Sequence, residues 1–157
     1  MEISDLLSPD AVVTNVKASG KKQLLQELSA RAAKLIRVPD KAVFETLSER
    51  EKLGSTGMGQ GIAIPHGRLT GIERMTGMFA RLDTPVEYEA MDDLPVDLVF
   101  VLLSPEGAGA EHLKALARVS RLLRDQGICE KLRAATRPDA LFSLLTDPSF
   151  RSGSQAA

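Results

Sequence analysis

The feature of the sequence that most limits its possible folds is an apolar run just before residue 104. Residues 96–103 read Val-Asp-Leu-Val-Phe-Val-Leu-Leu, and Asp97 is the only polar member. β-branched and aromatic side chains favour an extended chain. A near-continuous apolar run of this length is typical of a strand that is buried on both faces. We therefore expect residues 96–103 to form a central strand, with other elements covering both faces of its sheet.

Helical and extended patterns alternate along the rest of the chain. A second apolar strand is expected at 75–82, a short β-branched strand at 11–16, and an extended piece at 62–65. Apolar residues at helical spacing predict helices over 21–36, 41–52, 109–124, 128–135 and 138–145. This alternation indicates a single α/β (or α+β) domain built around a mixed β-sheet.

Local signals add detail to this outline. Asp40 follows Pro39 and is expected to N-cap the helix that begins at residue 41. Residues 83–85 and 92–95 carry turn chemistry and are expected to end extended segments. In the helix 109–124, Ser120 and the leucines at 113, 116 and 123 share one stripe.

Composition excludes several classes of protein. The chain has 157 residues, and 20 basic against 21 acidic side chains give a formal charge of −1, so there is no global electrostatic basis for binding nucleic acid or an anionic membrane. Cys129 is the single cysteine, which excludes a disulfide framework and a multi-thiolate zinc site. No apolar run approaches 18 residues and the start lacks a basic leader. We expect a cytoplasmic protein with a domain over 1–147 and a disordered tail over 148–157.

The first histidine lies in an unusual backbone context. His66 follows Pro65, which fixes its own φ, and precedes Gly67, which permits a sharp turn. A histidine at such a strand-to-loop position can hold its imidazole in a cleft. The alternative is a loop histidine that is merely flanked by turn residues, and the residues alone leave both interpretations open.

The second histidine, His112, falls in the first turn of the helix that follows Gly109. Unpaired N–H groups and the helix dipole favour anions there. The alternative is a histidine packed beside Ala115 and Val119, and its spacing by itself favours this packing role.

Arg50 ends the second predicted helix and precedes a glycine-rich loop. Its guanidinium is a permanent cation with five donors, well suited to phosphate oxygens. The alternative is an exposed helix cation between Glu49 and Glu51, and the same alternative holds for Lys52 and Arg68.

Several motifs with known chemistry are absent from the sequence. A dinucleotide fingerprint that starts at Gly57 would need glycine where Ile62 stands, and a P-loop that ends at Gly20-Lys21 would need glycine where Asn15 stands. No His-x-x-x-His pair or Gly-x-Ser-x-Gly elbow occurs. We therefore expect no cofactor, no metal site and no serine-hydrolase chemistry.

Taken together, the motifs resemble a known family. Arg50-Glu51, followed by residues 54–67 (Gly-Ser-Thr-Gly-Met-Gly-Gln-Gly-Ile-Ala-Ile-Pro-His-Gly), resembles the signature of the enzyme IIA domains of the mannitol/fructose class in the bacterial phosphotransferase system. The strand 99–103, followed by residues 111–120, resembles the second half of that pattern, and residues 3–7 resemble its start. The likeness covers residues 1–145, and within the class the chain is most similar to the nitrogen-type enzyme IIA.

The resemblance implies a phosphohistidine relay. His66 corresponds to the residue that receives a phosphoryl group on Nε2 from a histidine phosphocarrier protein of the nitrogen branch, and His112 and Arg50 correspond to residues near the phosphate. The implied fold is a mixed β-sheet flanked by helices on both faces, with the site at one edge. Implied downstream partners are regulatory targets such as potassium-transport or sensor-kinase components.

Two other functions remain open at this point. A sugar-specific enzyme IIA subunit would pass the phosphate to a fructose or mannitol permease. A non-catalytic regulatory module would use the cleft only to bind anions or partners.

The glycine-rich loop is expected to form the phosphate- and partner-binding surface. Its glycines would let the backbone approach the donor protein closely, and Met58 would supply an adaptable apolar contact. Met75 and Met78 are expected to fill the core instead. The expected surface consists of Gly54, Thr56, Gly57, Met58, Gly59, Gly61 and Gly67.

Overall fold

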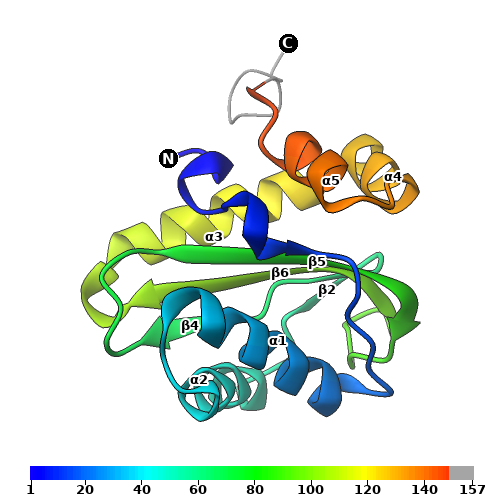
Figure 1. The fold of residues 1–157 in the computed structure, drawn as a ribbon. Helices are drawn as coiled ribbons and strands as arrows, with labels where there is room; N and C mark the ends of the chain where they lie inside the picture. Colours follow the sequence, from blue (N-terminus) through cyan, green and yellow to red (C-terminus); the bar gives the residue numbers. More distant parts are fainter. Residues whose placement is uncertain (149–157) are drawn as a thin grey trace.

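A computed structural model describes residues 1–148, which fold around a six-stranded mixed sheet (Figure 1). The strand order is β1-β5-β6-β3-β2, and β4 pairs with β6 beyond the end of β3. The strands are β1 (Val12–Val13), β2 (Gly57–Gly59), β3 (Ile62–Ala63), β4 (His66–Leu69), β5 (Thr76–Val86) and β6 (Val96–Pro105).

β6 is the central strand that the apolar run predicts. It pairs antiparallel with β5 on one side and parallel with β3 and β4 on the other. Residues 98–103 are almost completely buried. Asp97, the polar member of the run, accepts hydrogen bonds from the Arg133 guanidinium at 2.9–3.1 Å.

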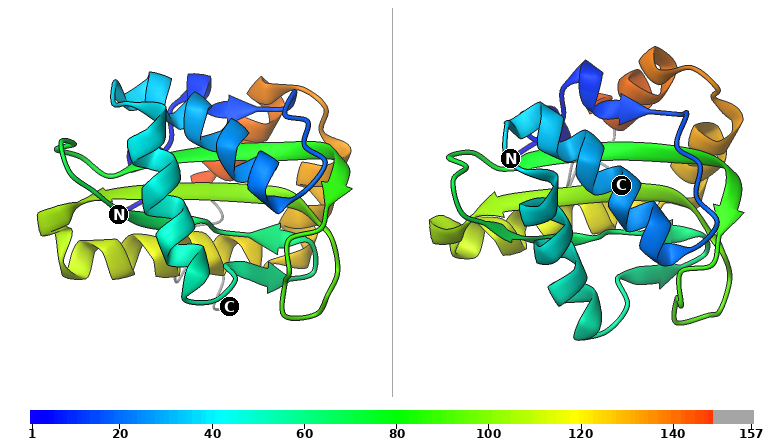
Figure 2. Two further views of the ribbon diagram at one scale, coloured as in Figure 1. Left: turned by 90° about the horizontal axis from the view of Figure 1, so that it is seen from below. Right: turned by 60° about the horizontal axis from the view of Figure 1, so that its bottom comes forward.

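Helices cover both faces of this sheet, as expected. α1 and α2 lie against one face, and α3, α4 and α5 lie against the other (Figures 1 and 2). The helices are α1 (Lys21–Ile36), α2 (Asp40–Lys52), α3 (Ala110–Leu123), α4 (Gln126–Ala134) and α5 (Pro138–Leu145). Short 3₁₀ turns lie at η1 (Ile3–Asp5), η2 (Pro9–Ala11) and η3 (Glu106–Ala108).

Amphipathic spacing accounts for how the helices pack. Leu24, Leu28 and Ala32 form the buried stripe of α1 that the sequence predicts. In α3 the buried face runs through His112, Ala115 and Val119, so that Leu113 is 63% exposed. Of the predicted stripe, Leu123 is buried, whereas Leu113 lies outside the buried face of α3.

Three local expectations are wrong. Asp40 is the first residue of α2 and makes no capping bond, because Pro39 occupies the N-cap position. The strand expected at 11–16 has only Val12–Val13, since Ala11 belongs to the turn η2 and only residues 12 and 13 pair with β5. Residues 83–85 do not end β5, which continues to Val86 through an irregular register after Arg81.

The expected disordered tail lies, except for Pro148, outside the described residues. Within residues 1–148, no helix is long and apolar enough to cross a membrane.

Candidate functional site

His66 lies directly after a break between the short strands β3 and β4. β3 pairs with Leu98 and Val99 of β6, and β4 pairs with β6 from Leu102 onwards. Pro65 lies between these two ladders; it has no N–H to donate, and its carbonyl accepts a hydrogen bond from Leu102 N at 3.0 Å. His66 is thus the first residue of β4, and not a strand-to-loop residue as the sequence indicated.

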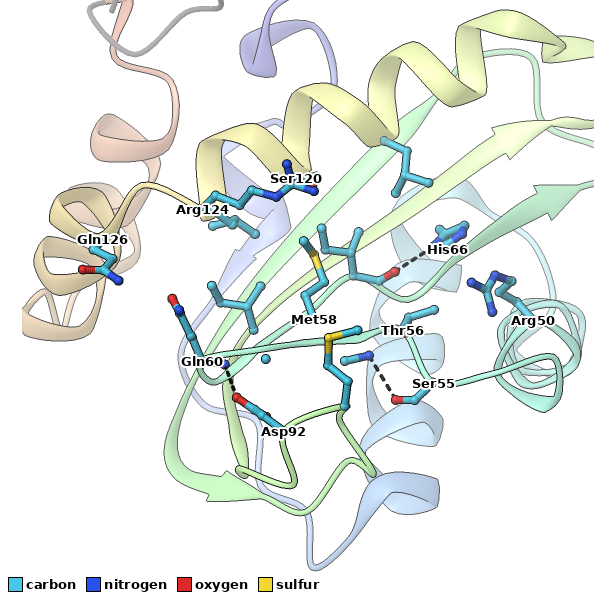
Figure 3. Close-up of a pocket in the computed structure, with 17 residues that line it drawn as sticks. Arg50, Ser55, Thr56, Met58, Gln60, His66, Asp92, Ser120, Arg124 and Gln126 are labelled. Atoms are coloured by element: carbon cyan, nitrogen blue, oxygen red, sulfur yellow. Dashed lines mark hydrogen bonds between the residues drawn. The ribbon is translucent and has the colours of Figure 1, made fainter.

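The backbone beside this break orients the His66 ring. Nδ1 of His66 lies 2.7 Å from the carbonyl oxygen of Ile64 (Figure 3). A carbonyl only accepts, so Nδ1 carries the proton and donates it. The lone pair of the neutral ring is therefore on Nε2.

Gly67 has a different role from the one expected. It lies within β4 and makes no sharp turn. A Cβ atom at this position would come within 2.5 Å of the Thr46 Cγ2 methyl group on α2. Glycine therefore allows α2 to pack closely against the strand that carries His66.

The fold brings His112 next to His66. Their ring centroids are 5.6 Å apart and the ring planes are inclined at 46°. His112 is only 6% exposed, and its Nδ1 lies 2.7 Å from the Ser104 hydroxyl of β6. The burial of His112 agrees with the alternative of a packed histidine. The same packing places its ring beside His66.

Arg50 lies in the last turn of α2, beside the His66 ring (Figure 3). Its Nη1 donates to the Gly54 carbonyl at 2.8 Å, which ties the guanidinium to the start of the glycine-rich loop. Arg50 is therefore not a free helix cation; it is held at the site by the loop that follows its helix.

Two surface cavities meet at Arg50, His66 and Leu116. One, of 630 Å³, is lined by the loop residues Thr56, Gly57, Met58 and Gly59 (Figure 3). The other, of 750 Å³, is lined by Gly67, Arg68, His112 and Leu113. Gly54 and Gly61, which the sequence also assigned to this surface, line neither cavity.

Both imidazoles are favoured in their neutral forms. Burial lowers the pKa of His66 from its ordinary value of 6.5, and the nearby Arg50 charge acts in the same direction, against the Ile64 hydrogen bond and Glu51. Burial also lowers the pKa of His112, with added contributions from Arg68 and His66. The site thus combines a neutral nucleophilic nitrogen, a second imidazole and a guanidinium.

Comparison with known proteins shows the family of the chain. The family described as "Phosphoenolpyruvate-dependent sugar phosphotransferase system, EIIA 2" matches residues 5–147. The chain belongs to the EIIA 2 family.

Several of its relatives in this family are nitrogen regulatory proteins. The chain is 57% identical to the nitrogen regulatory protein of Bradyrhizobium diazoefficiens over 94% of this chain and 97% of that protein. The crystal structure of nitrogen regulatory protein IIA-Ntr from Neisseria meningitidis superposes with a TM-score of 0.86 at 38% identity, covering 92% of this chain and 99% of that one. A sugar-specific relative, the fructose-specific EIIABC component of Bacillus subtilis, is 33% identical over 92% of this chain but only 23% of its own length. The chain therefore falls within the nitrogen regulatory branch of the EIIA 2 family.

A buried polar cluster supports the glycine-rich loop of this EIIA 2 domain. The Glu51 side chain is only 6% exposed and accepts from Thr56 N and Tyr88 OH, both at 3.0 Å. It also accepts from the Thr56 hydroxyl and pairs with Lys21 Nζ at 3.0 Å. At the start of the loop, the Glu51 carboxylate therefore binds both the backbone N–H and the hydroxyl of Thr56.

This role of Glu51 could not be predicted from the sequence. In the sequence, Glu51 is a neighbour of Arg50 and part of the family motif, whereas its partners Lys21 and Tyr88 lie on α1 and in the segment that follows β5. The buried Tyr88 hydroxyl stays protonated, since burial and the Glu51 carboxylate both raise its pKa. No local pattern connects residues 21, 51 and 88.

The glycine-rich segment forms β2 (Gly57–Gly59) and then a tight turn that leads into β3. Gly59 and Gly61 have φ values of 94° and 82°, which favour glycine. Met58 is half-buried and packs against the core while it lines a cavity, and Met78 is a core residue as expected. Among residues 1–148, no group of three or more His, Cys, Asp or Glu side chains could hold a metal ion.

Proposed function

We propose that this EIIA 2 protein is a cytoplasmic phosphoryl carrier of the nitrogen-related phosphotransferase system, and that it accepts a phosphoryl group on Nε2 of His66. The observation that carries the proposal is the hydrogen bond from His66 Nδ1 to the Ile64 carbonyl. It leaves Nε2 as the nucleophile of a ring that lines a cavity shared with Arg50.

The donor is a histidine phosphocarrier protein. In the transfer step, the bond between phosphorus and the donor's imidazole nitrogen breaks, and a bond between phosphorus and His66 Nε2 forms. The donor nitrogen regains its electron pair. The His66 proton stays on Nδ1, hydrogen-bonded to the Ile64 carbonyl. No further reactant is needed.

Arg50 and His112 assist this transfer. Phosphoryl transfer passes through a loose transition state with charge on the equatorial oxygens, so catalysis is mainly positioning and electrostatic stabilisation. A guanidinium and an imidazole beside the acceptor ring supply donors for those oxygens. The loop surface formed by Thr56, Gly57, Met58 and Gly59 contacts the partner protein.

The output of the protein is regulatory. The identity to nitrogen regulatory proteins over almost their whole length favours a carrier whose phosphorylation state is read by targets. Phosphorylation adds about −1.5 to −2 charges, by analogy with other phosphoresidues, beside the partner-binding loop. Targets are regulatory proteins such as potassium-transport or sensor-kinase components.

A phosphorylation assay tests the carrier function. The protein is incubated with phosphoenolpyruvate, enzyme I and a histidine phosphocarrier protein, and intact mass and ³¹P NMR are recorded at alkaline pH. One acid-labile phosphate per chain is expected, absent in His66→Ala and attainable in His112→Ala. Wild-type labelling of His66→Ala contradicts the proposal, and an unlabelled wild type favours the non-catalytic binding module instead.

A capture experiment tests the output. Lysate proteins are captured on wild type, phosphorylated wild type and His66→Ala. A target that binds the unmodified form and His66→Ala, but not the phosphorylated form, is expected. Absence of any such target, with rapid transfer of the phosphate to a sugar-permease domain, would support the sugar-specific alternative.

A further inference from the structure

Ser104 places a fully buried hydroxyl against the ring of His112. It lies near the end of β6, is 0% exposed, and its Oγ is 2.7 Å from His112 Nδ1. The sheet register pairs Ser104 with Arg68, two residues beyond His66 on β4. Ser104 and His66 therefore lie on neighbouring strands, and His112 of α3 packs against this part of the sheet.

The direction of this hydrogen bond follows from the burial of the serine. Within residues 1–148, the acceptor that the structure gives the Ser104 hydroxyl is His112 Nδ1. If Nδ1–H were instead the donor, the hydroxyl proton would be buried without a partner, at a cost of about 1–3 kcal/mol. Ser104 thus donates to the Nδ1 lone pair, and the neutral His112 ring carries its proton on Nε2.

The two neighbouring histidines consequently have opposite tautomers. His66 holds its proton on Nδ1, against the Ile64 carbonyl, and exposes the Nε2 lone pair. His112 accepts at Nδ1 and offers Nε2–H, in a cavity that it lines together with His66. One ring supplies an attacking electron pair, and the other supplies a hydrogen-bond donor.

We propose that Ser104 is a positioning residue that holds neutral His112 in its Nε2–H tautomer, so that this N–H donates to an oxygen of the phosphoryl group on His66. The proposal rests on the function proposed above for His66. Ser104 touches neither the phosphoryl group nor the partner protein, and it acts only through His112. The lowered pKa of His112, caused by burial and by the Arg68 charge, supports the neutral ring.

Loss of the serine hydroxyl has a definite chemical consequence. Without a donor at Nδ1, the His112 ring is free to adopt the Nδ1–H tautomer. That tautomer directs a lone pair, and not an N–H, towards the phosphoryl oxygens. Phosphoryl transfer to His66 then slows by about tenfold, which corresponds to the loss of one hydrogen bond in the transition state.

Ring-nitrogen NMR of the unphosphorylated protein tests the tautomer directly. Two-dimensional ¹H–¹⁵N spectra should show His112 as Nε2–H in wild type and in Ser104→Thr, which keeps the hydroxyl. In Ser104→Ala the Nδ1 and Nε2 shifts should move towards a tautomer mixture. Ser29→Ala is the matched control, because Ser29 is a buried serine of α1 whose hydroxyl has no partner within the described residues; it should leave the His112 signals unchanged.

Transfer rates measured on the same variants test the role in the reaction. Ser104→Ala should lower the rate of phosphoryl acceptance about tenfold in an otherwise wild-type protein. In a His112→Gln background it should change the rate less than twofold, because an amide donates N–H without a tautomer. Should Ser104→Thr not fold, this comparison of backgrounds still decides the question.

The outcomes that contradict the proposal are distinct from failure of the carrier function. An Nδ1–H ring in wild type, or a His112 tautomer unchanged by Ser104→Ala, overturns the proposal. An equal slowing by Ser104→Ala in both backgrounds also overturns it, since the serine would then act through general structure. Wild-type protein that accepts no phosphate contradicts the function proposed for His66, and the NMR result still reports on Ser104.

Discussion

The imidazoles of His66 and His112 lie 5.6 Å apart between centroids, and each is anchored through Nδ1 to a different partner. The Ile64 carbonyl accepts from one ring, and the Ser104 hydroxyl holds the other. Because both anchors occupy Nδ1, both Nε2 atoms are left to react with or bind what enters the cavity. Two residues far apart in the sequence thereby form one site with complementary groups.

His66 is expected to titrate below its ordinary pKa of 6.5. Burial lowers this pKa most, and the Arg50 charge adds to the effect. The acceptor nitrogen should therefore stay unprotonated through neutral pH, and phosphoryl acceptance should decline only as the pH falls below 6.5. A ring NMR titration measures the midpoint; a value at or above 6.5 would contradict this expectation.

The same lowered pKa should make stability depend on pH. The unfolded chain binds a proton at His66 near pH 6.5, whereas the folded chain binds it only at lower pH. The contribution of His66 to the free energy of unfolding should therefore fall as the pH drops through 6.5 towards the folded pKa, and be constant below that value. Denaturant titrations at several pH values should show a smaller decrease for His66→Gln than for wild type.

Replacement of Arg50 should slow transfer without preventing it. Arg50→Ala removes a charge-assisted donor worth roughly 1.5–3 kcal/mol, or about one to two orders of magnitude in rate. Arg50→Lys should recover only part of this, because an ammonium cannot bind two oxygens as a planar fork. Lys52→Ala is the control, since Lys52 is an exposed cation paired with Glu49. Single-turnover rates equal to wild type in Arg50→Ala would make Arg50 a structural residue only.

Gly67→Ala should displace the strand that carries His66. The new methyl group would meet Thr46 Cγ2 at 2.5 Å, and overpacking of this kind costs about 1–3 kcal/mol. Thr46→Ser removes that methyl group, so the double variant should regain most of the lost stability. Gly107→Ala meets nothing within 4 Å and should be nearly neutral. Thermal unfolding of wild type, Gly67→Ala, the double variant and Gly107→Ala measures these differences. A double variant no more stable than Gly67→Ala would contradict the proposed clash with Thr46.

Tyr88→Phe should destabilise the base of the glycine-rich loop. It removes a donor from the buried Glu51 carboxylate, at a cost of about 1–3 kcal/mol for the group left unpaired. Glu49→Gln, an exposed neighbour on α2, should change stability by less than about 0.5 kcal/mol. Denaturant unfolding measures the free energy of unfolding of both variants. Similar losses for the two would show that the buried cluster does not stabilise the base of the loop.

The parts of the fold that the sequence predicts depend on spacing along one element. The central strand follows from the apolar run 96–103, and α1 and α5 have the predicted limits because their apolar spacing and their flanking turn residues agree. β2 and β4 are missed, because glycine-rich segments such as Gly57–Gly59 carry no apolar alternation. These segments are held in the sheet by β3 and β6, which no local pattern reports.

The candidate site was predicted in part for a similar reason. Family resemblance selects His66, His112 and Arg50, and the structure brings them together. In the sequence, Glu51 is a neighbour of Arg50, and Ser104 follows the predicted strand 96–103. Their roles depend on long-range contacts, to Lys21 and Tyr88 in one case and to His112 in the other.

The apolar rim around His66 should govern docking of the phosphocarrier protein. Leu53 is 84% exposed, and both Leu53 and Leu113 line the cavity that contains His66 and His112. A donor that brings its phosphohistidine to His66 must cover these side chains, and burial of apolar area then favours the complex.

Leu113→Ser and Leu53→Ser should therefore raise the KM for the phosphocarrier by about three- to tenfold, which corresponds to losing roughly 0.7–1.4 kcal/mol of apolar contact. The kcat should change little, because neither leucine supplies a donor to the phosphoryl oxygens. Leu94→Ser is the matched control: Leu94 is also exposed, but it precedes β6 and lines neither cavity. Steady-state rates at varied phosphocarrier concentration separate the two constants. A lowered kcat at unchanged KM, or an equal rise in KM for Leu94→Ser, would show that the rim does not form the docking surface.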